Sequence, residues 1–134
     1  MVIEWTDAYK IGIPGLDDDH KKLVDTVNHF FTQAEYGVDT RALGIILDQV
    51  VAQMEAHFQR EETLLDRHDY LDRLGHTTRH QQVMQQLKRF IEPYKSGALL
   101  HDQTCDKAEF LSNLLIKHII EDDQPFKSCL RTLV

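Results

Sequence analysis

Five histidines and one glutamate occupy positions where the surrounding pattern places apolar residues. They are His20, His57, Glu61, His76, His80 and His118. Burying imidazoles and a carboxylate without partners is costly, so each needs a hydrogen-bonding or ionic partner in the core. Imidazole nitrogens and carboxylate oxygens are common ligands of iron, zinc and manganese. The pattern therefore predicts a buried metal site rather than a set of hydrogen-bonded core histidines.

The sequence spacing within two pairs of these residues supports the predicted metal site. His57 and Glu61 are four residues apart, and so are His76 and His80. In a helix this separation puts both side chains on one face, about 40° apart.

A second carboxylate, Asp123, follows His118 by five residues. On a regular helix that is about 140° away from the histidine. Pro125 disfavours helical geometry at the residue before it, so the helix is expected to end close to Asp123. A distorted last turn would bring this carboxylate back toward the core.

The number of ligands limits the chemistry. Five imidazoles and two carboxylates are too many for one ion, since tetrahedral zinc takes four ligands. Two ions that share both carboxylates and a solvent bridge would leave one coordination position open. The neighbours of that position in sequence or helical turn are apolar: Phe58, Leu115 and Ile119. An apolar open position favours reversible binding of a small diatomic molecule over acid–base turnover.

Apolar residues at alternating steps of three and four predict four helices. The expected ranges are 17–36, 40–66, 71–94 and 105–122, after an irregular arm over 1–16 and before a tail over 123–134. Gly37 and Gly97 are expected to end the first and third helices, with Pro93 near the end of the third. The fold class is therefore an all-α, antiparallel up-down-up-down four-helix bundle in a single domain, 1–134. In it, the start of one helix neighbours the end of the next, so the six side chains meet in one layer.

Charge and composition argue against several classes of partner and location. A net charge of -7 and a pI near 5.5 argue against nucleic acid and anionic membranes as partners. The sequence contains no apolar run long enough for a membrane span and begins without the features of a secretory signal. Cys105 and Cys129 form no CxxC pair, so free thiols are expected. These features predict a cytoplasmic protein, and a monomer is expected.

The whole chain resembles the haemerythrins, more closely the bacterial ones. The matching residues are Trp5 and Gly12 in the arm, Asp-Asp-Asp-His at 17–20, His57-Phe58-x-x-Glu61-Glu62, His76-x-x-x-His80, and Leu115-x-x-His118-Ile119 followed by Asp123. A pattern of seven ligands in this order and spacing is highly specific. Other positions depart from the family: Asp19 stands where glutamine is usual, Leu65 where methionine is frequent, and Leu114 where tryptophan is usual. None of these is a ligand, but they bear on oxygen affinity, autoxidation and access.

The resemblance implies two iron ions joined by an oxo or hydroxo bridge and by the carboxylates of Glu61 and Asp123. The six-coordinate iron would be held by His76, His80 and His118. The open iron, where oxygen binds, would be held by His20 and His57. Leu115 matches the family leucine that packs over the oxygen site.

Four further polar residues are expected to face solvent: His29, Glu62, His68 and His101.

The sequence leaves three functions open. The leading one is reversible O2 binding for carriage, storage or sensing, by a protein that is not an enzyme. The second is a di-iron oxidase, peroxidase or ferroxidase, but bundles of that type carry Glu-x-x-His on two helices, and this motif does not occur in the chain. The third is a signalling module that responds to O2 or nitric oxide (NO), which would need a separate output partner.

Overall fold

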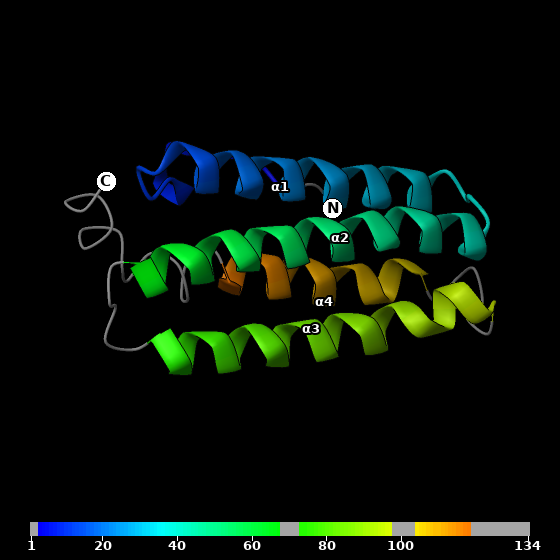
Figure 1. The fold of residues 1–134 in the computed structure, drawn as a ribbon. Helices are drawn as coiled ribbons and strands as arrows, with labels where there is room; N and C mark the ends of the chain where they lie inside the picture. The colour runs from blue at the N-terminus through cyan, green and yellow to red at the C-terminus, as the bar shows by residue number, and fades with distance from the viewer. Residues whose placement is uncertain (1–2, 68–72, 98–103, 119–134) are drawn as a thin grey trace.

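The described part of the chain contains four α-helices (Figure 1). The structure, a computed structural model, describes residues 3–67, 73–97 and 104–118. The helices are α1 (Pro14–Glu35), α2 (Thr40–Arg67), α3 (Arg73–Ser96) and α4 (Thr104–Lys117). Successive helices run in opposite directions, and the described ranges contain no strand. The predicted all-α four-helix bundle is confirmed.

The helices pack through the faces on which apolar residues recur every three or four positions. Helix α1 packs against α2 and α4, and α2 packs against α3. Side chains from all four helices fill the core, among them Leu23, Val27, Phe30, Leu43, Leu47, Leu87, Tyr94 and Leu111. Their burial supplies the main driving force for the fold, since each large apolar side chain contributes about 1.5–3 kcal/mol when removed from water.

The first helix begins at Pro14, three residues before the expected start at position 17. Proline suits the first helical turn because its missing N–H would have no partner there and its fixed φ is helical. The Asp17 carboxylate accepts hydrogen bonds from the backbone N–H groups of Ile11 at 2.8 Å and Gly12 at 3.1 Å. Gly12 has a φ of 88°, which glycine adopts without strain. These bonds hold the turn that leads into α1.

The N-terminal arm is more ordered than the irregular segment expected over residues 1–16. It contains a short 3-10 helix, η1 (Asp7–Tyr9), and the rings of Trp5 and Tyr9 meet edge to face at 5.6 Å. Both rings pack against the main core. Ile3 exchanges two hydrogen bonds with the Asn28 side chain, at 2.7 and 2.8 Å, which tie the arm to α1.

Glycines terminate two helices as expected. Gly37, two residues after the end of α1, has a φ of 79°, and Gly97, directly after α3, has a φ of 73°. Both adopt the left-handed conformation common at helix C-termini. Helix α3 continues through Pro93 to Ser96, two residues beyond the expected end. The fully buried Tyr94 packs on Phe30 and Phe90, and these contacts hold the last turn in helical form.

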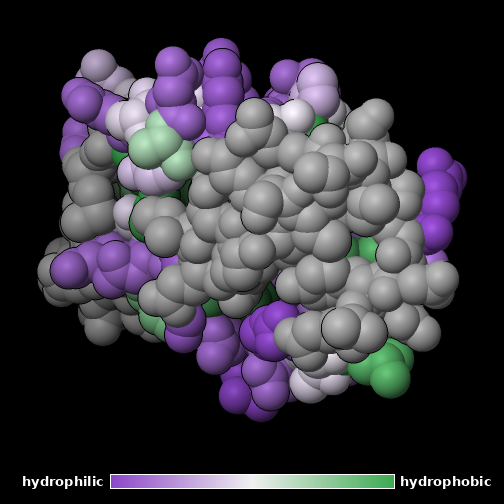
Figure 2. All heavy atoms as spheres, turned by 90° about the vertical axis from the view of Figure 1, so that its left-hand side faces the viewer, coloured by the Kyte–Doolittle hydropathy of each residue, from purple (hydrophilic) through white to green (hydrophobic). Residues whose placement is uncertain are grey.

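One end of the bundle carries the polar layer. Here α1 and α3 begin and α2 and α4 end, at the left in Figure 1. Figure 2 looks onto this end, where hydrophilic side chains predominate around the rim among the described residues. Within the described ranges, no helix is long and apolar enough to cross a membrane.

Candidate metal centre

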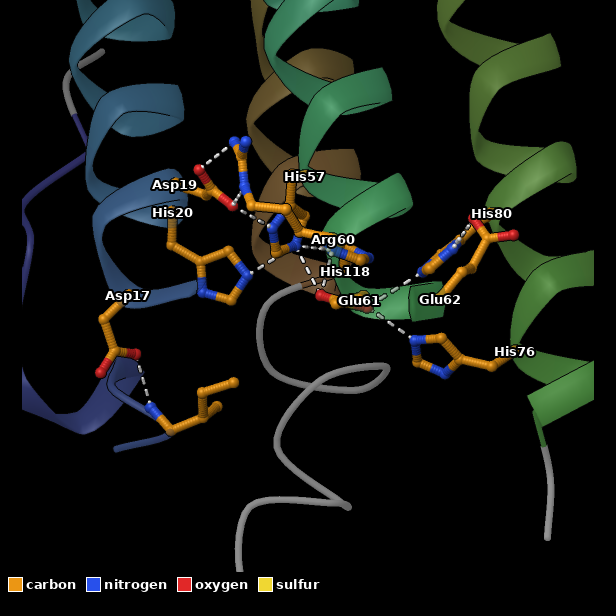
Figure 3. A network of polar contacts seen from close by, with 11 residues as sticks. Asp17, Asp19, His20, His57, Arg60, Glu61, Glu62, His76, His80 and His118 are labelled. Carbon is orange, nitrogen blue, oxygen red and sulfur yellow. Dashed lines mark hydrogen bonds and ion pairs between the residues drawn. The ribbon is translucent and has the colours of Figure 1, made fainter. Parts of the chain in front are cut away.

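Six of the seven predicted ligands meet in one buried layer. His20 lies near the start of α1, His57 and Glu61 near the end of α2, and two histidines near the start of α3. His118 directly follows α4. All six residues are at most 2% exposed, and they are His20, His57, Glu61, His76, His80 and His118. Their convergence is shown in Figure 3. Asp123, the seventh predicted ligand, lies outside the described residues.

The Nε2 atom of His57 lies at the centre of one group of donor atoms. It is 3.0 Å from His20 Nε2 and 3.1 Å from His118 Nε2. It is also 2.6 Å from Oε2 of Glu61. Three imidazoles and one carboxylate oxygen therefore face a common point.

The second group uses the other oxygen of the same carboxylate. Oε1 of Glu61 is 2.8 Å from His76 Nε2 and 3.1 Å from His80 Nε2. Glu61 thus lies between two sets of imidazoles and directs one oxygen toward each (Figure 3). In each set the ligand atoms lie within 4.8 Å of one another. This is the arrangement that a carboxylate shared by two cations requires.

Hydrogen bonds on the outer side of two rings support a cation inside. Nδ1 of His57 is 3.2 Å from Asp19 Oδ2, and Nδ1 of His80 is 3.2 Å from Glu62 Oε2. An ionised carboxylate only accepts hydrogen bonds, so each Nδ1 carries the hydrogen. In a neutral imidazole the inner Nε2 then has a lone pair, which faces an oxygen of Glu61. Two acceptors at these distances repel unless a positive charge lies between them.

The chemistry of the donor set fits two first-row transition-metal ions. Imidazole nitrogen with carboxylate oxygen suits iron, zinc and manganese. A neutral imidazole whose outer N–H is bonded to a carboxylate is the usual form of a metal-binding histidine. The layer therefore contains two groups of side chains that could each hold a metal ion, and Glu61 belongs to both groups.

The position of His118 differs from the division that the resemblance implies. There it joins His76 and His80 on one iron. In the structure its Nε2 atom is 3.1 Å from His57 Nε2 and 3.8 Å from Glu61 Oε2, and it falls in the group with His20 and His57. The assignment of His118 to the six-coordinate iron stays a prediction.

Behind His57 lies a pair of charged residues that the sequence analysis did not assign to the site. The Asp19 side chain, 7% exposed, receives the His57 Nδ1–H on Oδ2. Arg60 clasps the same carboxylate, with Nε 2.7 Å from Oδ2 and Nη2 bonded to Oδ1. Burial by itself raises the pKa of Asp19, but the hydrogen bonds and charges of His57 and Arg60 outweigh it and lower that pKa to about 2. The hydrogen bond to Asp19 raises the pKa of Arg60.

Two more polar residues surround the histidines of α3. Glu62 was expected to face solvent, but its side chain is only 32% exposed and contacts His80, so that expectation holds only in part. Nη2 of Arg79 lies 3.3 Å from His76 Nδ1. Glu62 and Arg79 could have been noted from the sequence, since one follows Glu61 and the other is three residues after His76. His29 is exposed as expected, whereas His68 and His101 lie outside the described residues.

Apolar side chains cover part of the layer. The Phe58 ring stacks on His80 with centroids 3.8 Å apart, and its centroid is 4.9 Å from that of His118. Leu115 is buried one turn before His118 on α4. Two of the three predicted pocket residues thus lie beside the ligands or one turn away, and the third, Ile119, lies outside the described residues.

Comparison with known proteins identifies a matching family. Residues 11–130 match the family described as "Hemerythrin HHE cation binding domain". A bacteriohemerythrin of Stenotrophomonas maltophilia (strain R551-3) is 26% identical over 125 residues, covering 93% of this chain and 79% of that protein. A bacteriohemerythrin of Methylococcus capsulatus (strain ATCC 33009 / NCIMB 11132 / Bath) is 26% identical over 130 residues, covering 96% of this chain and 97% of that protein.

A solved structure agrees with these relatives. The crystal structure of a wild-type hemerythrin superposes with a TM-score of 0.84 at 25% identity. The match covers 98% of this chain and 99% of the other. The matched region therefore includes the helices that surround the candidate metal centre.

Proposed function

The chain belongs to the haemerythrin family, and we propose that it binds O2 reversibly at a non-haem di-iron centre. The observation that carries the proposal is the position of Glu61. Its two oxygens face two separate sets of imidazole Nε2 atoms, at 2.6 Å on one side and 2.8 and 3.1 Å on the other. A single ion would need only one such set, whereas a pair of ions would use both.

The residues proposed to hold the two iron ions come from α1, α2, α3 and the segment that directly follows α4. They are His20, His57, Glu61, His76, His80, His118 and Asp123. When bound, the iron pair with its oxo or hydroxo bridge would supply the electrons and the open coordination position that oxygen binding needs. Glu61 holds the two halves together, and the resemblance assigns the same bridging role to Asp123.

The apolar cover supports binding rather than turnover. Phe58 packs flat against His80 and lies edge-on to His118, and Leu115 is 2% exposed beside them on α4. Ile119 is proposed to complete this cover. Such side chains keep water from the ligands and offer no acid or base to a bound diatomic molecule. We therefore favour an oxygen-binding protein over a di-iron oxidase, peroxidase or ferroxidase.

Metal content and an absorption spectrum, taken without oxygen and then in air, test the proposal directly. We expect two iron ions per chain and a colour that appears in air and disappears when oxygen is removed, over repeated cycles. One ion per chain, or an irreversible bleach on the first exposure to air, would contradict it. Steady consumption of peroxide or of ferrous iron would instead favour an enzyme.

A further inference from the structure

The two halves of the metal-binding layer have different partners on their outer sides. His57 faces the buried carboxylate of Asp19, and His80 faces the partly exposed carboxylate of Glu62. The guanidinium of Arg79 lies next to His76. One histidine therefore has a buried anion behind it, and another has a cation. Such outer partners orient metal-binding histidines and change how strongly they donate electrons to the ion.

Asp19 is the best held of these partners. Its side chain is 7% exposed, whereas the Glu62 side chain is 32% exposed. Arg60 binds both carboxylate oxygens of Asp19 from α2, the same helix that carries His57. This two-point contact fixes the carboxylate in one orientation, as planar guanidinium–carboxylate pairs do. The oxygen that accepts the His57 N–H cannot turn away without losing the contact to Arg60.

We propose that Asp19, clamped by Arg60, is a positioning residue that holds His57 with its Nε2 lone pair toward the metal centre and strengthens its donation to the ion there. The inference rests on the proposed function, because it assigns a role in the same centre. The anion behind His57 favours the more highly charged state of that ion. The two ions therefore differ in how strongly their higher charge state is favoured, and Asp19 affects the ion bound by His57.

Two substitutions separate the charge of Asp19 from its ion pair. Asp19→Asn keeps the shape and one acceptor oxygen but removes the anion. Arg60→Gln removes the clamp but leaves the anion in place. Both break the Asp19–Arg60 pair, so a purely structural role predicts the same consequence for both. Asp18→Asn is the matched control, because Asp18 is the adjacent exposed carboxylate and its loss changes the net charge equally.

The first measurement is binding of Co2+ to metal-depleted protein, followed by visible absorption. We expect Asp19→Asn to lower the affinity for one of the two Co2+ ions about 10- to 100-fold, the usual range for loss of such a partner. The other ion is expected to bind as in the wild type. Arg60→Gln is expected to show a smaller loss, and Asp18→Asn none. Equal weakening of both ions in Asp19→Asn, or no weakening, would overturn the proposal.

The second measurement is the reduction potential of the iron-loaded proteins. Removing the anion makes His57 a poorer donor, so Asp19→Asn is expected to raise the potential, whereas Arg60→Gln does not raise it. A similar rise in both variants would show that the pair acts only through structure and would refute the assigned role. If wild-type protein holds two ions and oxygenates reversibly while Asp19→Asn is unchanged, this inference fails alone. If the wild type does neither, the proposed function itself fails.

Discussion

His57 Nε2 lies 2.6 Å from Glu61 Oε2, one turn further along α2, and both residues are completely buried. The proposed centre depends most on these two groups. The His57 imidazole is hydrogen-bonded to Asp19 on its outer side, and the Glu61 carboxylate belongs to both sets of possible ligands. The contact between His57 and Glu61 also defines the most direct substitution for testing the centre.

Glu61→Gln is expected to reduce bound iron from two ions to at most one per chain. The amide has nearly the same volume as the carboxylate but no negative charge, and its NH2 group cannot act as a ligand. Metal analysis gives the stoichiometry, and circular dichroism should show that the helices remain. Glu55→Gln is the control, since the Glu55 side chain is 51% exposed and pairs only weakly with Lys88 at 3.6 Å. Two ions retained in Glu61→Gln would contradict the shared-carboxylate arrangement.

Phe58→Ala is expected to lower the free energy of unfolding by about 3–5 kcal/mol, the usual loss for a buried phenylalanine. The ring is 3% exposed and stacks on His80, so its removal also opens a space beside the ligands that admits water. We expect irreversible oxidation in air to become faster, as followed by loss of the oxygenated spectrum. Phe110→Ala provides the comparison, because Phe110 is 45% exposed. A wild-type oxidation rate in Phe58→Ala would show that the ring does not protect the centre.

Asn28→Ala is expected to release the N-terminal arm from α1. It removes the two hydrogen bonds to the backbone of Ile3, and the expected loss of stability is about 1–3 kcal/mol. Hydrogen exchange should become faster at Ile3 and in the adjoining arm while the core of α2 is unchanged. Thr26→Ala serves as the control on the same helix, since the Thr26 hydroxyl only bonds to the Lys22 carbonyl at an exposed site. An unchanged arm in Asn28→Ala would mean that Trp5 and Tyr9 suffice to hold it.

The depressed pKa of Asp19 predicts a dependence of stability on pH. Its pKa is about 2 in the folded protein against an ordinary value of 3.8, so the folded state favours the ionised form. The resulting stability is fully present above pH 3.8 and is lost as the pH falls toward 2. The difference corresponds to about 2 kcal/mol.

Urea unfolding of metal-depleted protein between pH 5 and pH 2 provides the measurement. We expect the free energy of unfolding to decrease by about 2 kcal/mol more in the wild type than in Asp19→Asn. The exposed Asp18→Asn variant should behave as the wild type does. Parallel curves for wild type and Asp19→Asn would show that the Asp19 carboxylate gains nothing from His57 and Arg60.

The partners of the histidines illustrate what could not be predicted along the chain. Asp19 precedes His20, so it lies about 100° round the helix from the stripe that faces the core. From that position alone it belongs on the solvent side of α1. It is nevertheless buried, and its carboxylate contacts His57 and Arg60 of α2. The substitution of aspartate for the usual glutamine was visible in the sequence, but its partner on another helix was not.

Helix ends show the same division on a smaller scale. Pro14 could have been used to start α1, because proline favours the first helical turn. The continuation of α3 past Pro93 depends instead on Tyr94, whose ring is buried between Phe30 and Phe90. A local signal to stop was outweighed by packing with another helix.

The sequence alone determined the fold class, the donor types and their common level in the bundle. Helical periodicity places residues on faces, and the antiparallel order brings helix starts next to helix ends. Only the tertiary structure decided which atoms meet: the two oxygens of Glu61 divided between two sets of imidazoles, His118 beside His57, and the Asp19–Arg60 pair behind it. These contacts depend on how far neighbouring helices are rotated and how closely they approach, and no spacing within one helix contains that information.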